Sequence, residues 1–289
     1  MESEENLSSI RGDEPESSVL YVVGTPIGNL NDISFRSKNL LSKVSFIACE
    51  DTRHTKKMLN ALKIKNKLIS FNEYNSKVKT EHIINKLKEG VSVALVSDAG
   101  MPLISDPGEY LVSIARKQNI EVICSPGPCA ALTSLVTSGL SSSCFSFIGF
   151  VPKKKIERDK CFKNIANNSH TTIVYESPKR IKSFIRELRN YCEDSRIVHI
   201  SKELTKKYED HWKGNLHDIS YEIENIDPKG EFTIVIEGMK IKKDLNEMAQ
   251  QLLRNDLDEL IKLGLKRRSA ASYLANKNGI AKNIIYNLK

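Results

Sequence analysis

Apolar runs that alternate with amphipathic stretches constrain the fold of this 289-residue chain most strongly. The runs fall at residues 19–24, 44–49, 67–71, 91–97 and 121–125, and the amphipathic stretches at 33–43, 53–63, 77–89 and 108–118. The runs are apolar throughout, which is typical of strands that are covered on both faces of a sheet. Repeated strand–helix pairs of this kind predict a mostly parallel α/β sheet.

A second set of elements follows a stretch rich in Ser and Gly near 137–143, where we place a domain boundary. Strands are expected at 143–150, 171–177, 196–201 and 231–238, and helices at 156–167, 179–191 and 215–225. The segment 211–215 offers a further strand, which leaves a mixed or an antiparallel sheet open. The predicted domains are therefore 19–138 and 139–240, both of the α/β class.

The two ends of the chain differ from this pattern. Residues 1–18 carry six acids and one base and predict a disordered acidic tail. Residues 241–289 show no strand pattern and predict a small module of two or three helices, similar to a helix-turn-helix, with Gly264 and Gly279 as helix stops.

Loops rich in Gly and Pro follow several of the expected strands: GTPIGN, SDAGMPLISDPG, SPGPCAA and YESP. In α/β sheets, ligands bind beyond the carboxyl ends of the strands, where such turns let the backbone approach a ligand closely. Loops of α/β proteins often contain these residues anyway, but four of them in one chain favour a real pocket.

Several kinds of pocket are excluded by absent motifs. The chain has no G-x-x-x-x-G-K-[ST], GTPIGN lacks the third glycine of G-x-G-x-x-G, and the G-x-S-x-G elbow is missing. The six cysteines form no C-x-x-C and the histidines have no ligand spacing, so no metal site is predicted. We therefore expect a ligand that is neither a nucleoside triphosphate nor a metal ion.

The charge distribution favours a polyanionic partner. The net charge is +8, but outside the acidic tail 43 bases face 30 acids. Eight bases lie within 151–180 and six within 265–289, where they suit contacts to nucleic-acid phosphates. The alternative is a genome biased toward Lys, since 32 of the 44 bases are Lys.

Seven segments together resemble the tetrapyrrole-methylase superfamily: LYVVGTPIGNLNDIS, IACEDTRHT, ALVSDAGMPLISDPG, SPGPCAALTSLVTSGL, IVYESPKRI, SKELTKKYE and KGEFTIVIEG. They are most similar to its ribosomal branch, the 2′-O-ribose methyltransferases of small-subunit ribosomal RNA. The resemblance covers about 18–240, and the C-terminal module is similar to that branch's accessory domain. It implies two α/β domains with S-adenosylmethionine in the cleft between them, a homodimer, and as substrate a cytidine (position 1402) in the decoding region of 16S ribosomal RNA or the small ribosomal subunit.

The same resemblance implies a set of cofactor contacts that come from the strand-end loops and from the second domain. They are Pro26, Ile27, Gly28, Asp98, Gly100, Met101, Ile104, Cys129, Ala130, Tyr175, Leu204 and Gly230. Met101 stands where the superfamily's usual G-D-P motif has its Asp. We therefore expect backbone groups and apolar surface to make the cofactor contact that a carboxylate would otherwise make. Small residues and apolar walls suit the adenosine and methionine parts of such a cofactor.

Methyl transfer to a ribose hydroxyl benefits from a general base or an orienting polar group. The candidates are Asp51, Arg53, Lys202 and Lys206. Arg53 would bind a phosphate, and Asp51 would accept the hydroxyl proton or orient Arg53. The alternatives are a helix cap at 50–52 and a solvated turn at 202–206.

Other function classes remain as alternatives. A tetrapyrrole methyltransferase acting on a small molecule would not need the basic clusters, and a noncatalytic RNA-binding protein would not need the cleft loops. No apolar run is long enough to span a membrane, and the N-terminus has no signal-peptide pattern, so we expect a cytoplasmic protein without a membrane partner.

Overall fold

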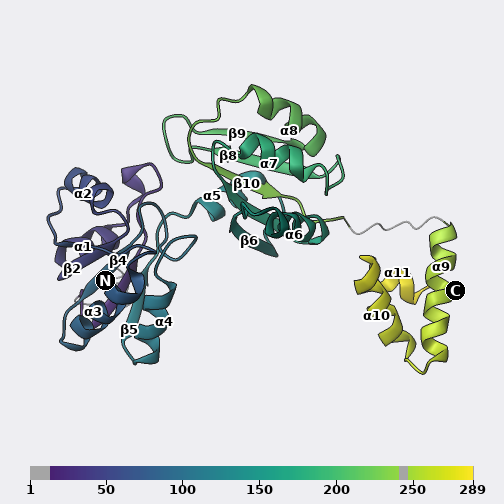
Figure 1. Ribbon diagram of the computed structural model, residues 1–289, viewed down its shortest axis with the longest axis horizontal. Coiled ribbons are helices and arrows are strands. Elements are labelled where there is room, and N and C mark those ends of the chain that lie inside the picture. The colour runs from purple at the N-terminus through teal and green to yellow at the C-terminus, as the bar shows by residue number, and fades with distance from the viewer. Residues whose placement is uncertain (1–13, 241–246, 289) are drawn as a thin grey trace, which may run out of the picture.

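The five N-terminal apolar runs form one parallel sheet in the computed structural model, which describes residues 14–240 and 247–288 (Figure 1). Its strands are β1 (Val19–Val23), β2 (Phe46–Cys49), β3 (Leu68–Ser70), β4 (Val93–Val96) and β5 (Glu121–Ser125). The strand order is β3-β2-β4-β1-β5, and every pairing is parallel. The predicted α/β class is confirmed for this half.

Helices cover both faces of this sheet, which explains why its strands are apolar throughout. The helical elements are η1 (Leu30–Asp32), α1 (Phe35–Lys43), α2 (Thr52–Ala61), α3 (Ser76–Lys88) and α4 (Glu109–Lys117). Leu40 of α1 and Leu59 of α2 belong to the core on one face, and Ile83 of α3 and Leu111 of α4 to the core on the other. All four side chains are buried.

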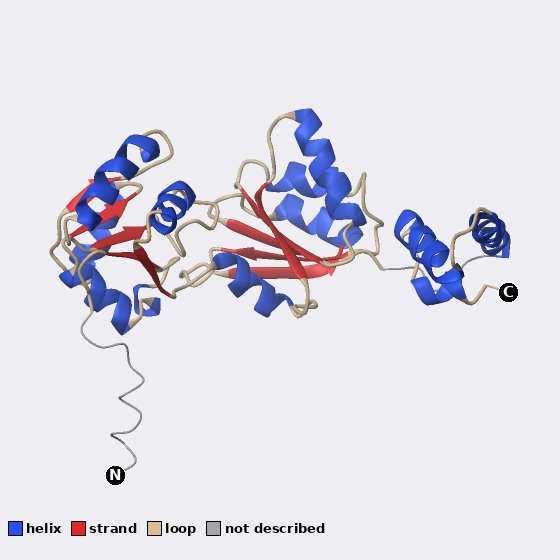
Figure 2. Cartoon of the chain, turned by 90° about the horizontal axis from the view of Figure 1, so that it is seen from below, coloured by secondary structure: helices blue, strands red, loops and turns tan. Residues whose placement is uncertain are grey.

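The second sheet is mixed, one of the two arrangements left open by the sequence. Its strands are β6 (Phe145–Phe150), β7 (Thr171–Glu176), β8 (Ile197–Lys202), β9 (Asp210–Asn215) and β10 (Phe232–Ile236), in the order β6-β7-β10-β8-β9. Only β6 and β7 pair in parallel. The strand suspected at 211–215 is β9. Figure 2 shows the two sheets side by side, each with helices against it.

One face of the second sheet packs against α6 (Lys155–Asn167), α7 (Ile181–Leu188), α8 (Leu216–Glu222) and the 3-10 turn η2 (Ile223–Asn225). The other face is covered by α5 (Ala130–Ser138), whose Ala131 and Leu135 pack against Ile173 of β7 and Val235 of β10. The helix α5, which precedes the predicted boundary at 138, thus packs against the second sheet. Its small residues, which resembled a linker in the sequence, let the helix lie close to the sheet.

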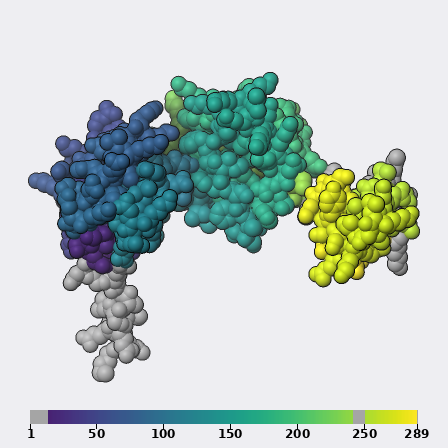
Figure 3. Space-filling model, turned by 60° about the horizontal axis from the view of Figure 1, so that its bottom comes forward, coloured from purple at the N-terminus to yellow at the C-terminus, as the bar shows by residue number. Residues whose placement is uncertain are grey.

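The C-terminal residues form the predicted helical module, with α9 (Glu247–Lys262), α10 (Arg267–Asn278) and α11 (Lys282–Tyr286). Leu257, Leu274 and Ile285 make a small core of its own, and Figure 3 shows the module as a separate lobe. Gly264 and Gly279, the predicted stops, have φ values of 97° and 64°. Among the described helices, none is long and apolar enough to cross a membrane.

The last residues of the predicted N-terminal tail contact the first domain. The Glu14 carboxylate accepts hydrogen bonds from Arg36 Nε at 2.7 Å and Nη2 at 2.6 Å, and its side chain is only 6% exposed. Residues 14–18 are thereby held against the first domain. The rest of the tail, residues 1–13, lies outside the described residues.

Candidate active site

A cavity of about 300 Å³ lies where the strand-end loops of the first domain face the second sheet. Its first-domain wall comes from the loops after β1, β4 and β5, and its second-domain wall from β6, β7, β10 and residues next to them. Seven of the predicted cofactor residues line it: Ile27, Gly100, Met101, Ile104, Cys129, Ala130 and Tyr175. The pocket predicted beyond the carboxyl ends of the strands is present, and most of its lining is apolar.

Backbone contacts join the three first-domain loops. Thr25 and Gly100 form an isolated bridge, with Thr25 N 2.9 Å from Gly100 O and Gly100 N 3.2 Å from Thr25 O. A Cβ added to Gly24 would lie 2.6 Å from the Cα of Gly127. Glycine is required there because two backbones approach more closely than side chains allow.

The two domains also touch at the edges of the cavity. The backbone N–H of Asn29 donates to Thr205 Oγ1 at 3.1 Å, and Gly28 lies so close to Lys206 that a Cβ on it would come 2.3 Å from the Lys206 side chain. A Cβ on Gly149 would lie 2.7 Å from Ser105 Oγ. These contacts fix the separation of the two cavity walls.

Five predicted cofactor residues lie beside the cavity without lining it: Pro26, Gly28, Asp98, Leu204 and Gly230. Gly28 and the buried Leu204 form part of the contact between the domains, and Gly230 packs against Glu203. Asp98 Oδ1 accepts a hydrogen bond from the backbone N–H of Asp51 at 3.0 Å, which ties the loop after β4 to that after β2. The positions of these five residues suit a role in shaping the loops around the cavity.

Asp51 and Arg53, two of the predicted catalytic residues, form an ion pair outside the cavity. Asp51 caps α2 by accepting the backbone N–H of Arg53 at 2.8 Å, as the cap alternative expected. The hydrogen bonds from the Arg53 side chain and backbone hold the pKa of Asp51 well below its usual range. A carboxylate in that state is a weak proton acceptor.

The two predicted lysines are also engaged outside the cavity. Lys202 Nζ donates to the backbone carbonyl of Asp227 at 3.1 Å. Lys206 Nζ lies 3.0 Å from Glu203 Oε1 and 2.8 Å from Glu231 Oε2. Burial acts to lower the pKa of Lys206, but the hydrogen bonds to Glu231 and Glu203 raise it above its ordinary value. Lys206 therefore stays charged and is unsuited to accept a proton.

An aromatic cluster forms part of the second-domain wall, and only Tyr175 of it was predicted as a site residue. The Tyr175 ring packs edge-on against Phe147 at 5.0 Å and Phe150 at 5.6 Å between centroids. Its hydroxyl accepts the backbone N–H of Ala131 at 3.1 Å, and burial raises the pKa of Tyr175 above its ordinary value. Phe150 also lines the cavity.

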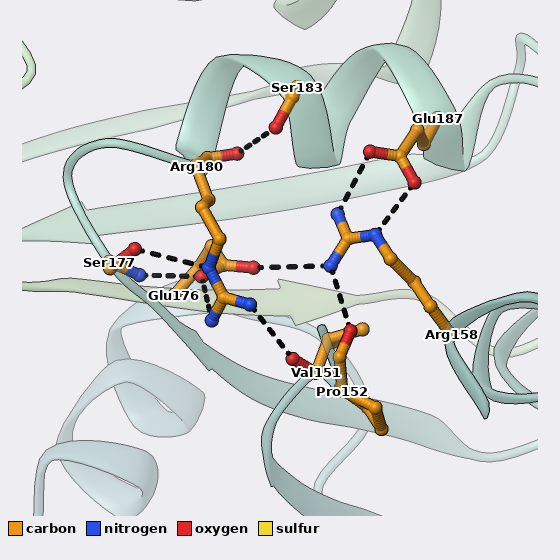
Figure 4. Close-up of polar contacts among 8 residues, drawn as sticks. All are labelled: Val151, Pro152, Arg158, Glu176, Ser177, Arg180, Ser183 and Glu187. Carbon is orange, nitrogen blue, oxygen red and sulfur yellow. Dashed lines mark hydrogen bonds and ion pairs between the residues drawn. The ribbon is translucent and has the colours of Figure 1, made fainter. Parts of the chain in front are cut away.

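Sequence reasoning also missed the acids of the cavity, namely Asp106, Glu176 and Glu231. Glu176 ends β7 and is almost completely buried, with Arg180 Nη2 2.6 Å from its Oε1 and Arg158 Nη1 3.8 Å from its Oε2 (Figure 4). Arg158 in turn pairs with Glu187 at 2.7 Å. The motif YESP contained Glu176, but its partners become visible only in three dimensions.

Asp106 lies in the loop after β4, in SDAGMPLISDPG, and its environment differs from that of the other two acids. Burial and the nearby Glu50 and Asp98 raise the pKa of Asp106 to about 6, although a hydrogen bond with Ser97 opposes the rise. The position of this motif at a strand end was the sequence signal that could have indicated Asp106 as a site residue.

The basic clusters separate into structural and exposed residues. Within 151–180, Arg158 and Arg180 form ion pairs with Glu176 and Glu187. The lysines of the cluster are exposed: Lys153, Lys154, Lys155, Lys160, Lys163 and Lys179. In the C-terminal module, Lys266, Arg268 and Lys277 are exposed as well. Lys289 of that cluster lies outside the described residues. Across the described residues, no group of three or more His, Cys, Asp or Glu side chains could hold a metal ion.

Comparison with known sequences places this chain among methyltransferases. The sequence model of the Tetrapyrrole (Corrin/Porphyrin) Methylases matches residues 19–220. Ribosomal RNA small subunit methyltransferase I of Halalkalibacterium halodurans is 40% identical over 275 residues, covering 94% of this chain and 95% of that protein. The protein of the same name from Vibrio cholerae is 40% identical over 271 residues and covers 93% of both chains.

Solved structures share the fold at lower sequence identity. The methyltransferase CobJ aligns with a TM-score of 0.58 at 17% identity, covering 78% of this chain and 96% of that one. Uroporphyrin-III-C-methyltransferase from Thermus thermophilus aligns with a TM-score of 0.55 at 16% identity, covering 75% and 94%. A further structure of the Thermus protein is a complex with S-adenosylhomocysteine, at a TM-score of 0.51 and 14% identity, covering 75% of this chain and 96% of that one.

Proposed function

The chain belongs to the tetrapyrrole methylase family and, within it, to the group named ribosomal RNA small subunit methyltransferase I, and from that premise we propose its reaction. The enzyme transfers the methyl group of S-adenosylmethionine to the 2′-hydroxyl of a cytidine ribose, position 1402, in the decoding region of 16S ribosomal RNA. The observation that carries the proposal is the 40% identity to a ribosomal RNA small subunit methyltransferase I over 94% of the chain.

The cavity fits S-adenosylmethionine on structural grounds. Ile27, Met101, Ile104 and Phe150 supply apolar surface. Such apolar walls suit an adenosine and a methionine chain. When bound, the cofactor supplies a methyl group on a sulfonium, which is electrophilic.

The protein's own contribution is to position the reactants and to exclude water. The contacts between the domains, such as Asn29 with Thr205, hold the two walls at a fixed separation. Alignment of the reacting atoms at near-attack distance lowers the barrier by several kcal/mol, so a rigid cavity serves the reaction directly.

The RNA would bind at the exposed lysines that follow β6. Lys153, Lys154 and Lys155 come directly after the strand that ends at Phe150 in the cavity wall, which places these cations near its rim. Arg53, with a side chain 88% exposed, adds a phosphate site beside the end of β2. Exposed cations position RNA through its phosphates without reading the sequence.

We also propose a cytoplasmic homodimer. Ribosomal RNA is a cytoplasmic substrate in bacteria, and the described helices include no membrane span. Exposed apolar side chains on α5 (Leu132 and Val136) and on the edge strand β6 (Phe145 and Ile148) support pairing of two copies through the second domain. Analytical ultracentrifugation of the full chain tests this, and a monomer at micromolar concentration contradicts it.

The test of the reaction uses small ribosomal subunits that lack the modification, incubated with the protein and labelled S-adenosylmethionine. We expect label in 16S RNA at a single ribose, located by nuclease digestion and mass spectrometry. Free 16S RNA in parallel identifies the preferred substrate form. Label in an added porphyrinoid and none in RNA would instead support the tetrapyrrole alternative.

A further inference from the structure

The loop between β8 and β9, residues 203–209, borders the cavity from the second domain and also contacts the first domain. Lys206 Nζ lies 2.8 Å from Oε2 of Glu231, which lines the cavity. Thr205 Oγ1 accepts the backbone N–H of Asn29, in the loop after β1, at 3.1 Å. The loop therefore lies at the edge of the cavity where the two domains meet.

Hydrogen bonds within this loop fix its conformation, although its last three residues are exposed. Glu203 and Thr205 have φ values of 52° and 66°, in the left-handed region that residues other than glycine rarely adopt. The backbone N–H of Lys206 donates to Glu203 O at 3.0 Å, and that of Glu209 donates to Lys206 O at 3.1 Å. Such strain persists only where the surrounding contacts enforce it, so the tip of the loop has a rigid base.

Tyr208, at the tip of the loop, is a large aromatic residue that is 70% exposed. No hydrogen bond joins its hydroxyl to another residue that the structure describes. The Nζ atom of the exposed Lys207 lies 5.4 Å from the centroid of the Tyr208 ring. Among the described residues, none forms an ion pair with Lys207. The loop thus presents an aromatic ring and a positive charge together, beside the cavity.

The acids that follow Tyr208 take part in contacts within the chain. The Glu209 carboxylate accepts the backbone N–H of Thr205, and its Oε1 lies 2.9 Å from Nε2 of His211. Asp210 Oδ1 accepts the backbone N–H of His211 at 2.8 Å. These contacts occupy both carboxylates, whereas the Lys207 ammonium group is left for an external anion.

The chemistry of the Lys207–Tyr208 pair matches a single strand of RNA. Proteins bind unpaired RNA by stacking its bases on aromatic rings and by placing cations at its phosphates. A ribose that enters a cavity of about 300 Å³ takes its nucleotide out of line with the neighbouring bases, so the adjacent base lacks a stacking partner. A protein partner would need a contiguous apolar patch, and the residues on either side of Tyr208 are charged.

We propose that Tyr208 stacks on the base next to the methylated cytidine, a role that rests on the function proposed above. Lys207 contacts a phosphate of the same RNA segment. The stacked base is not the reacting group, so this contact is equally strong before and during methyl transfer. Tyr208 therefore lowers the KM for RNA and leaves kcat unchanged.

The test removes the ring in the variant Tyr208→Ala. Methyl transfer is measured over a range of concentrations of small ribosomal subunits that lack the modification, and binding of S-adenosylmethionine is measured by calorimetry. We expect the KM for subunits to rise about 5- to 150-fold, the range for loss of one stacked base, with kcat within about twofold of wild type. Cofactor affinity should stay unchanged, because Tyr208 does not line the cavity.

Two further substitutions at the same position separate stacking from other roles of the side chain. Tyr208→Phe retains the ring and should keep the wild-type KM, because the hydroxyl has no partner among the described residues. Tyr208→Leu retains an apolar side chain without an aromatic face and should resemble Tyr208→Ala. Thermal unfolding of the three variants should match that of wild type, since the side chain is exposed.

Tyr221→Ala is the matched control in the same domain. Tyr221 is 62% exposed on α8, and the guanidinium of Arg189 lies over its ring at 5.9 Å from the centroid. This ring also has a cation beside it, but α8 packs against the face of the second sheet opposite α5. The control should change neither KM, nor kcat, nor cofactor affinity.

The outcomes separate this inference from the proposed function. If wild type methylates no RNA, the proposed function fails and the inference fails with it. If wild type methylates RNA and the KM of Tyr208→Ala rises by less than about fivefold, the inference alone fails. Equal KM values for Tyr208→Leu and Tyr208→Phe would show that the ring does not stack. A loss of cofactor affinity in Tyr208→Ala would make Tyr208 a support of the cavity and would overturn the inference as well.

Discussion

The guanidinium of Arg53 binds the carboxylate of Asp51 through two hydrogen bonds, with Nε 3.1 Å from Oδ1 and Nη2 2.8 Å from Oδ2. Asp51 at the same time caps α2, so one carboxylate both begins the helix and orients the arginine. Of the two roles considered for Asp51, this geometry favours orientation of Arg53 over proton transfer. It leaves the other face of the guanidinium, on a side chain 88% exposed, toward solvent at the carboxyl end of β2.

Replacement Arg53→Ala should reduce methyl transfer to RNA by at least about tenfold, because the enzyme loses a charge-assisted, bidentate contact to an RNA phosphate. Cofactor affinity should remain within twofold, since Arg53 does not line the cavity. Steady-state kinetics with ribosomal subunits and calorimetry with S-adenosylmethionine measure the two effects. Lys86→Ala, which removes another exposed cation in an ion pair, is the control and should change neither. A large loss of cofactor binding would remove the assignment of Arg53 to the RNA.

Replacement Gly24→Ala should impair both folding and cofactor binding. The new methyl group would lie 2.6 Å from the Cα of Gly127, so two loops must separate, at a cost of about 1–3 kcal/mol. Because both loops border the cavity, affinity for S-adenosylmethionine should fall together with the melting temperature. Gly214→Ala is the matched control, since its nearest neighbour would be at 3.5 Å. Equal effects of the two substitutions would show that the close approach is unimportant.

Replacement Arg180→Ala should destabilise the second domain strongly. Glu176 has a side chain with 0% exposure, and the substitution leaves only Arg158, at 3.8 Å, to balance its charge. Removal of one partner from a buried ion pair typically costs about 3–5 kcal/mol. Urea denaturation measures the loss, and Arg186→Ala is the control, because its side chain is 63% exposed in a surface pair with Glu224. The double variant Arg180→Ala, Glu176→Gln should recover part of the stability; no recovery would mean that the charge of Glu176 is not the cause.

Local patterns in the sequence predicted most of this fold because the central strands β1, β2, β4 and β10 are buried along their whole length. Six of the seven predicted residues that line the cavity follow the ends of first-domain strands, which are recognisable from Gly and Pro, and the seventh, Tyr175, lies in β7. The sequence could not indicate that α5 packs against the second sheet. Ser134 Oγ of this helix lies 2.7 Å from Ser201 Oγ of β8, a contact between residues 67 positions apart.

The charged residues of the cavity were harder to predict than its apolar walls. Glu176, Glu231 and Asp106 have the same chemistry in the sequence, and they differ only in which cation lies beside them in the fold. Conversely, Asp51 and Lys206 looked available in the sequence and are committed to ion pairs. Proton-transfer roles depend on such partners, so they could not be assigned before the sheets were placed.

His199 should make the stability of the protein depend on pH in the acid range. It is buried on β8, where Nε2 lies 3.0 Å from Ser201 Oγ and 3.5 Å from Thr137 Oγ1, and its ring stacks on His211 at 5.3 Å. Burial, followed by the nearby His211 and Lys213, lowers the pKa of His199 to about 4.

The sign of the effect follows from the protons bound by each state. Between pH 4 and the ordinary pKa of 6.5, the unfolded chain protonates this histidine and the folded chain does not, so stability rises with pH across that window and is constant above it. The slope is at most about 1.4 kcal/mol per pH unit for one proton. In His199→Gln this contribution is absent, so the difference in unfolding free energy between wild type and variant should shrink or reverse from pH 7 to pH 4.5. Denaturant titrations at both pH values measure it, with His82→Gln on the exposed face of α3 as control. Parallel pH profiles for wild type and His199→Gln would mean that His199 is protonated equally in the folded and unfolded states.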